Sequence, residues 1–356
     1  MQTESLPGTP APLLPIEDPA ATRAREHNNR GALLHLEGKF DEARVEYEAA
    51  LETDPRDATA ANNLGYLLAQ QGQLDEALSR YRQALEIDPL NSMTFANLGI
   101  TQAATSQTSA ALASLERAVQ LDERNVLAWD HLTKLLMSVG RLAEAEASCR
   151  AALQIAPTDS GRCVTLGTII GAQERFEEAA ATLRQAIRLD PKSAKAWTQL
   201  GVVLFLRQDL GSATEALEQG LQLAPDDHDA RHHLALVYLA RGQVTAAEHV
   251  LERIVIASKP ADSIHVAAQV DLAVIECSRG DAGRALARLD RIQTDPENFR
   301  ATFYRAMALE QMDRATEAGE LLRKLAGTNG GKYSAQARAL LAARDQVQDF
   351  SSSEEA

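Results

Sequence analysis

Residues 61–89 read ANNLGYLLAQQGQLDEALSRYRQALEIDP, and this stretch decides the fold. Apolar residues recur at helical spacing on both sides of Gly72, which is the pattern of two amphipathic helices joined by a turn. Asp75 and Glu76 open the second helix, where the helix dipole favours acidic side chains. Pro89 ends that helix, because proline lacks the backbone N–H that a helix interior needs. The stretch therefore predicts one helix-turn-helix element.

The same pattern returns along the chain with a period of 34 residues. One alanine column consists of Ala43, Ala77, Ala111, Ala145, Ala179, Ala213 and Ala247. A glycine column keeps the same phase at Gly31, Gly65, Gly99, Gly167 and Gly201. The residues that precede new repeats are helix-capping types, namely Asp57, Asn91, Asn125, Asp159, Ser193 and Asp227. Self-similarity at a fixed period indicates a repeat protein.

The composition argues against several classes of protein. Lys and Arg number 36 against 50 Asp and Glu, and the net charge of −14 disfavours binding to a nucleic-acid backbone. Cys149, Cys163 and Cys277 are scattered, which favours buried thiols over disulfides or a zinc site. The N-terminus lacks a signal-peptide pattern, and no stretch stays apolar for the ~18 residues of a membrane span. We expect a cytoplasmic protein without membrane insertion.

The quoted stretch carries Leu64, Gly65, Ala77, Tyr81, Ala84 and Pro89 in a characteristic order. This pattern resembles the tetratricopeptide repeat (TPR) family, over about residues 24–332. The resemblance implies an all-α fold, a right-handed α-solenoid of about nine helix-turn-helix repeats. The repeats are expected to begin near residues 24, 58, 92, 126, 160, 194, 228, 266 and 299, the last two being degenerate. Extra residues at 259–265 predict an irregular step in the stack.

The two ends of the chain differ from the repeats. Residues 1–23 carry five prolines, which predicts a disordered, extended arm, and two PxxP spacings at Pro7–Pro10 and Pro12–Pro15 suggest a polyproline ligand as an alternative to a plain tail. Residues 333–348 are expected to form a helix that caps the stack, and residues 349–356 a polar tail.

The resemblance implies a concave surface lined by the first helix of each repeat, mainly at its second, fifth, sixth and ninth positions. The sixth position holds Asn29, Asn63, Asn97, His131, Thr165, Gln199 and His233. Regularly spaced amides can bond the backbone of an extended peptide, because each carries donors and an acceptor. Asn29, Asn63 and Asn97 resemble the asparagine ladder in the TPR superhelix of O-linked N-acetylglucosaminyltransferase, whose catalytic part has no counterpart here. The alternative is that these amides cap local backbone or face water.

The ninth position adds Tyr66 and Ile100, which would accept apolar side chains of a peptide or else pack against the neighbouring helix. A carboxylate clamp for an acidic C-terminal peptide is disfavoured, because its expected positions hold Asn28, Ala32, Asn63, Met93 and Asn97, with no cation. The cluster of His228, His232 and His233 is interpreted as groove-lining imidazoles rather than a metal site. Cys149 is expected in the core, not as a nucleophile.

The sequence thus predicts a non-enzymatic scaffold that binds an extended peptide or a helix of a protein partner in its groove. The candidate partner-binding residues are Asn29, Asn63, Asn97, His131, Gln199, His233, Tyr66 and Ile100. No catalytic residue, metal or other cofactor is predicted. Two alternatives stay open: a substrate-targeting subunit of a separately encoded enzyme such as a glycosyltransferase, and a scaffold that self-associates. Low lysine with abundant alanine and arginine suggests a bacterial source.

Overall fold

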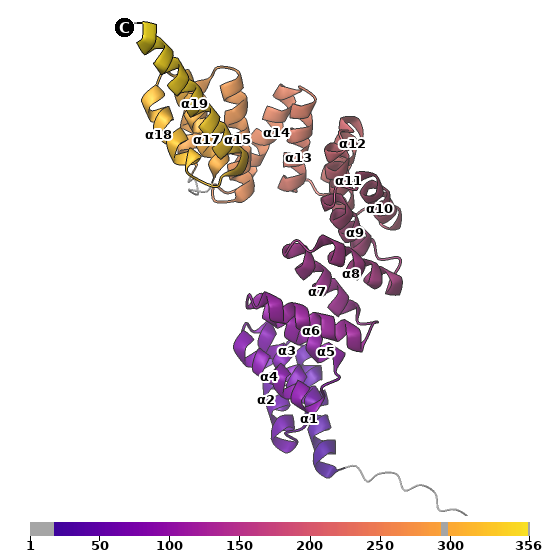
Figure 1. Ribbon diagram of the computed structural model, residues 1–356. Coiled ribbons are helices and arrows are strands. Elements are labelled where there is room, and N and C mark those ends of the chain that lie inside the picture. The colour runs from indigo at the N-terminus through magenta and orange to yellow at the C-terminus, as the bar shows by residue number, and fades with distance from the viewer. Residues whose placement is uncertain (1–17, 293–297, 355–356) are drawn as a thin grey trace, which may run out of the picture. The chain divides into compact units, whose positions relative to one another are not determined.

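The computed structural model describes residues 18–292 and 298–354 of the chain. Throughout these residues every regular element is an α-helix, and within each of two units successive helices pack on their neighbours in the chain (Figure 1). The predicted fold class, an all-α repeat solenoid, is confirmed. The chain divides into two compact units, residues 1–173 and 174–356, and each is described by itself.

The N-terminal unit contains four helix pairs and the first helix of a fifth. They are α1 (Pro19–Leu36), α2 (Phe40–Thr53), α3 (Ala58–Gln70), α4 (Leu74–Ile87), α5 (Ser92–Ala104), α6 (Thr108–Leu121), α7 (Val126–Ser138), α8 (Leu142–Ile155) and α9 (Ser160–Ala172). We number the repeats from the α1–α2 pair, so that α3–α4 is repeat 2 and α5–α6 is repeat 3.

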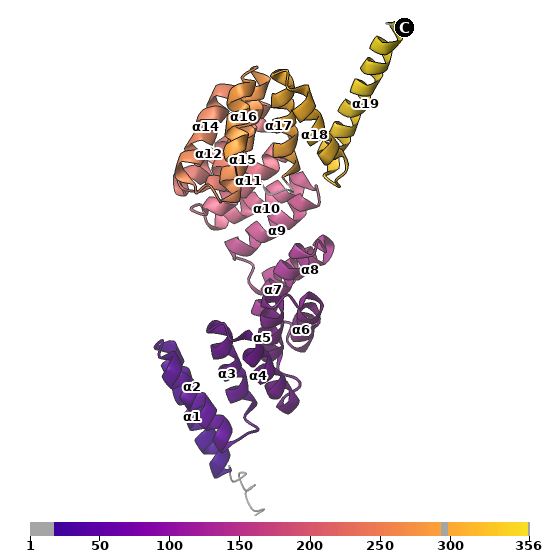
Figure 2. The same cartoon turned by 90° about the vertical axis from the view of Figure 1, so that its left-hand side faces the viewer.

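The C-terminal unit continues the same alternation. Its helices are α10 (Phe176–Leu189), α11 (Ala194–Leu206), α12 (Leu210–Leu223), α13 (His228–Ala240), α14 (Val244–Ala257), α15 (Ser263–Ser278), α16 (Ala282–Arg291), α17 (Phe299–Gln311), α18 (Ala315–Ala326) and α19 (Gly331–Glu354). Figure 2 shows α19 running past the end of α18. Among the described residues, no helix combines the length and the apolar character needed to cross a membrane.

Side-chain caps fix where the first helices begin. The side chains of Asp57, Asn91, Asn125, Asp159, Ser193 and Asp227 each accept the backbone N–H of the residue three positions later. Such a bond satisfies one of the backbone donors that a helix leaves unpaired at its start. The capping residues therefore place α3, α5, α7, α9, α11 and α13 at intervals of 34 residues.

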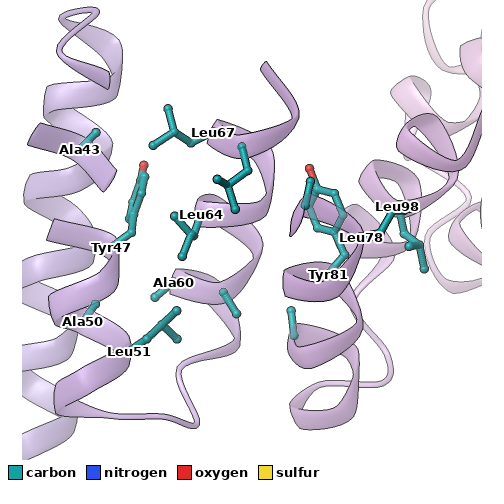
Figure 3. Close-up of a cluster of buried hydrophobic side chains, with 14 residues drawn as sticks. Ala43, Tyr47, Ala50, Leu51, Ala60, Leu64, Leu67, Leu78, Tyr81 and Leu98 are labelled. Atoms are coloured by element: carbon teal, nitrogen blue, oxygen red, sulfur yellow. The ribbon is translucent and has the colours of Figure 1, made fainter. Parts of the chain in front are cut away.

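Interlocking side chains form the core between consecutive repeats. Figure 3 shows Tyr47 and Leu51 of α2 facing Leu64 and Leu67 of α3, and all four side chains are buried. The glycine column permits the close approach within a repeat, because a Cβ added to Gly65 would lie 2.8 Å from the ring of Tyr81. Burying these apolar faces against their neighbours is what stabilises a stacked repeat protein.

Three boundaries differ from the predicted ones. Helix α1 begins at Pro19 rather than near residue 24, because Asp18 caps it and proline is well suited to the first helical turn. Residues 1–17, the rest of the predicted arm, lie outside the described residues. Helix α15 begins at Ser263, so the extra residues lengthen this helix by part of a turn, and its core with α13 and α14 is continuous. Helix α19 extends to Glu354, because no glycine or proline interrupts it after Gly331.

Candidate partner-binding surface

The amides on the first helices of repeats 1 to 3 bond to one another. Asn63 Nδ2 donates to Asn28 Oδ1 at 2.9 Å, and Asn97 Nδ2 donates to Asn62 Oδ1 at 3.0 Å. Asn62 Nδ2 in turn donates to Asn63 Oδ1 at 3.3 Å. We call these four residues the amide chain: it runs from α5 through α3 to α1, and each member donates to the next in the order Asn97, Asn62, Asn63, Asn28.

The amide chain differs from the predicted ladder in its members. Asn63 and Asn97 belong to both, but Asn29 is exposed and makes none of these bonds. Asn28 and Asn62, at the fifth positions, were missed by sequence reasoning, although their signal is the Asn-Asn pair at residues 28–29 and again at 62–63. The fifth position of one first helix thus meets the sixth position of the next.

These contacts orient the amides but leave some of their hydrogen-bond donors and acceptors unused. A side-chain amide offers two N–H donors and two acceptor lone pairs, and each bond above uses one of them. Asn28 and Asn97 are 7% exposed, whereas Asn62 and Asn63 are half-buried. Hydrogen-bonding capacity therefore remains at Asn62 and Asn63, the two members that water still reaches.

Exposed apolar side chains flank the amide chain. Tyr66 is 46% exposed on α3, Met93 is 48% exposed on α5 and Leu127 is 39% exposed on α7. Ile100, the other predicted apolar contact, is half-buried on α5. None of the second, fifth, sixth and ninth positions of repeats 2 and 3 carries a charge: they are Thr59, Asn62, Asn63, Tyr66, Met93, Ala96, Asn97 and Ile100. We call these eight residues, together with Leu127, the neutral strip.

A concavity of about 410 Å³ lies at the α1 end of the amide chain. Its lining includes Asn28, Asn29 and Arg25 from α1, and Arg56 and Asp57 from the connection to α3. Both charges are present, so the concavity has no net preference for anions or cations. It extends the polar surface beyond the last amide.

The amide chain stops at repeat 3. Ala96 occupies the fifth position of α5, so His131 on α7 has no amide there to meet. Burial lowers the pKa of the half-buried His131 imidazole, and the nearby positive charge of Lys134 lowers it further. Asp130, the fifth-position residue of α7, instead accepts two bonds from the Arg162 guanidinium, at 2.8 and 2.7 Å. At this repeat a charged contact takes the place of the amides.

The predicted residues of the C-terminal unit are Gln199 on α11 and His233 on α13. His233 Nδ1 lies 2.8 Å from the Asp229 carbonyl of its own helix, and Gln199 is half-buried on α11. His232 Nε2 lies 2.6 Å from Asp271 Oδ2 on α15, and Arg300 on α17 bonds the other oxygen of that carboxylate. Since Asp271 is 1% exposed, this contact joins three successive first helices through a buried charge.

The three histidines of the predicted cluster lie on α13, and Cys149 lies on α8. His228, His232 and His233 turn to different partners, and in the described part of the chain no three His, Cys, Asp or Glu side chains gather as metal ligands. Cys149 is buried, as the sequence predicted for a core residue. Burial raises the pKa of its thiol to about 12, so the nucleophilic thiolate is disfavoured.

Two family models match the sequence. The model described as the cilia and flagella-associated protein 70 C-terminal domain matches residues 7–236, and the model described as tetratricopeptide repeat matches residues 204–270. The first match alone covers more than half of the chain. The chain belongs to the tetratricopeptide repeat family.

Solved TPR structures share this fold at low sequence identity. A TPR protein from Parabacteroides merdae is 16% identical, with a TM-score of 0.59 over 71% of this chain and 98% of its own. PilF from Pseudomonas aeruginosa is 17% identical, with a TM-score of 0.53 over 64% and 99%. A chain in the structure of the APC/C hetero-tetramer Cut9–Hcn1 is 16% identical, with a TM-score of 0.52 over 83% of this chain and 54% of its own. No curated protein matches the sequence.

Proposed function

We propose that this TPR protein is a non-enzymatic interaction scaffold that holds an extended, uncharged segment of a partner protein along the neutral strip. One observation carries the proposal: the strip combines pre-oriented amides that still have hydrogen-bonding capacity with exposed apolar side chains beside them. Amides bond the backbone of a bound segment, and apolar side chains receive its larger residues.

The position of the charges supports an uncharged partner segment. The neutral strip covers the second, fifth, sixth and ninth positions of repeats 2 and 3 and Leu127 of α7 without a charged side chain, although the chain as a whole carries a net charge of −14. A charged segment would lose water there without gaining an opposite charge, which costs free energy. An acidic C-terminal tail is therefore a poorer fit than a segment with polar and apolar residues.

Pre-orientation contributes to binding in a second way. The amide of Asn63 is held by Asn28 on one side and Asn62 on the other. A side chain that is already fixed loses less conformational entropy when a ligand bonds to it. Relative to the size of the side chain, we therefore expect the loss of Asn63 to weaken binding most.

The partner-binding test compares three full-length variants with the wild type. Asn63→Leu removes the central amide, Tyr66→Ala with Met93→Ala removes the apolar flanks, and Val45→Ala is the control because Val45 is exposed on a second helix. Proteins captured from the native cell are quantified by mass spectrometry, and far-ultraviolet circular dichroism verifies folding.

At least one captured protein is expected to fall about tenfold with both strip variants and to stay unchanged with Val45→Ala. Equal capture by the wild type and all three variants, with intact helical spectra, would contradict partner binding at the neutral strip. A co-purifying enzyme would identify the targeting-subunit alternative, and light scattering over a dilution series tests self-association. We also propose a cytoplasmic location, from the lack of a signal-peptide or membrane-span pattern, and a bacterial source, from the composition.

A further inference from the structure

Three rings gather at the edge of repeats 1 and 2, where α1 turns into α2. The His35 ring centroid lies 5.6 Å from that of Phe40, edge to face, and 5.6 Å from that of Tyr66, tilted by 33°. Phe40 is 42% exposed and Tyr66 is 46% exposed. We call His35, Phe40 and Tyr66 the aromatic cluster.

The aromatic cluster is fixed in place and extended by an apolar neighbour. His35 Nε2 lies 2.7 Å from Gln70 Oε1, which anchors the central ring to α3. Leu36, next to His35, is 86% exposed. Rigid, exposed aromatic rings are the anchors that dominate protein recognition, and rows of such rings are the surfaces on which proline-rich segments dock as polyproline II helices.

We propose that residues 7–12 of the same chain dock on the aromatic cluster as a polyproline II helix. This segment contains Pro7, Pro10 and Pro12. Proline restricts the chain to this conformation before binding, so docking costs little entropy. Residues 5–16, SLPGTPAPLLPI, contain no charged side chain, which suits rings that carry no formal charge.

The length of the segment matches the distance it has to cover. His35 follows Asp18 by seventeen residues of α1, or about 25 Å along the helix axis. Pro12 and Pro7 precede Asp18 by six and eleven residues, or about 19 and 34 Å at 3.1 Å per residue of polyproline II helix. A segment that folds back along α1 therefore brings residues 7–12 to the aromatic cluster.

The family match supports a role for these residues within the repeat domain. The model that covers repeats 1 to 6 begins at residue 7, the first proline of the segment, and not at the first helix. The proposed contact between this segment and the aromatic cluster does not depend on the proposed partner, although it shares Tyr66 with the neutral strip. The experiment that tests the docking of this segment uses no partner protein. Either proposal can therefore be contradicted while the other stands.

Photo-crosslinking in the full-length chain tests the dock. Phe40 is replaced by p-benzoylphenylalanine, a ring that preserves the aromatic contact, and the crosslinked peptides are identified by mass spectrometry. The control carries the same group in place of Val45, which is 63% exposed on the same helix. Mixing isotope-labelled and unlabelled chains separates crosslinks within one chain from crosslinks between copies.

Crosslinks from position 40 to residues 7–12 of the same chain are expected, with few from position 45. Adding Tyr66→Ala is expected to lower their yield about tenfold, because one of the exposed stacking rings is lost. Equal yields from positions 40 and 45, crosslinks only between copies, or the absence of crosslinks to residues 7–12 would each overturn the proposal.

Discussion

The two units use the same pair of positions for opposite kinds of contact. In the N-terminal unit, the fifth position of one first helix and the sixth of the next are joined by neutral amides, Asn28 with Asn63 and Asn62 with Asn97. In the C-terminal unit, the corresponding residues are His232 and Asp271, and Arg300 adds a positive charge. One position pair therefore serves as a partly hydrated polar surface in one unit and as a buried ionic joint in the other.

The difference shows how burial decides what a contact does. Asp271 is 1% exposed and needs its partners, because an unpaired buried carboxylate is costly. Asn62 and Asn63 are half-buried and carry no charge, so they keep capacity for a ligand at little cost. The N-terminal contact suits recognition, and the C-terminal contact suits cohesion of the last repeats.

The largest expected effect is at the ionic joint. Asp271→Ala leaves His232 and Arg300 without their carboxylate and is expected to lower the free energy of opening α15 by about 3 kcal/mol. Hydrogen exchange of the α15 backbone amides measures this local opening. Asp281→Ala is the control, since Asp281 is exposed and makes no capping bond with its side chain. Equal exchange in both variants would mean that the joint contributes no cohesion.

A packing substitution tests whether the units differ only in their polar contacts. Gly65→Ala places a Cβ 2.8 Å from the Tyr81 ring, and Gly201→Ala places one 2.5 Å from Leu217 Cγ. Each is expected to cost about 2 kcal/mol of unfolding free energy, measured by urea denaturation, because both cores are overpacked alike. Gly211→Ala, which meets no atom within 4 Å, is the control. A clear loss at one glycine alone would show that the apolar packing differs as well.

The amide chain is expected to contribute less than the ionic joint. Asn62→Ala removes the acceptor of the buried Asn97 amide and is expected to cost about 1.5 kcal/mol, measured by hydrogen exchange of α5. Asn29→Ala is the matched control, because Asn29 is exposed outside the amide chain, and its effect is expected to stay within about 0.5 kcal/mol. A similar effect of both substitutions would show that the amide bonds do not stabilise the stack.

The smallest effect concerns pH. Because the pKa of His131 is lowered below 6.5 in the folded chain, the unfolded chain takes up the proton first as the pH falls. The contribution of neutral His131 to the free energy of unfolding is therefore complete above pH 6.5 and declines below it. His131→Gln is expected to give a flatter profile of melting temperature between pH 7 and pH 5 than the wild type. Parallel profiles would show that His131 does not titrate differently in the two states.

The sequence period predicts the fold well and the contacts between repeats poorly. The capping residues and the 34-residue columns identify the helices, because both depend on local backbone chemistry. The amide contacts join residues 35 apart, one more than the period, and no single column reveals them. The His232–Asp271 contact spans 39 residues, because the extra residues before α15 shift its register. Which side chains meet across a stack depends on helix packing, which the period alone does not specify.

The likeness to the asparagine ladder of O-linked N-acetylglucosaminyltransferase stays a prediction. Asn63 and Asn97, two of the three residues on which it depends, are engaged with neighbouring amides. The Asn-Asn pairs and the alanine that interrupts them at residue 96 were readable in the sequence. Their hydrogen bonds required coordinates, because rotation of an amide by half a turn exchanges its donor and acceptor.

The uniform direction of the amide chain has a consequence for how a strand would be read. From Asn97 to Asn28 each amide donates to the next, so the three hydrogen bonds of the row share one direction. A polypeptide backbone is also directional, since its carbonyls and N–H groups follow a fixed order. In the proposed complex, a peptide and its reversed sequence would therefore not be equivalent, and the amides would distinguish the two orientations of the bound backbone.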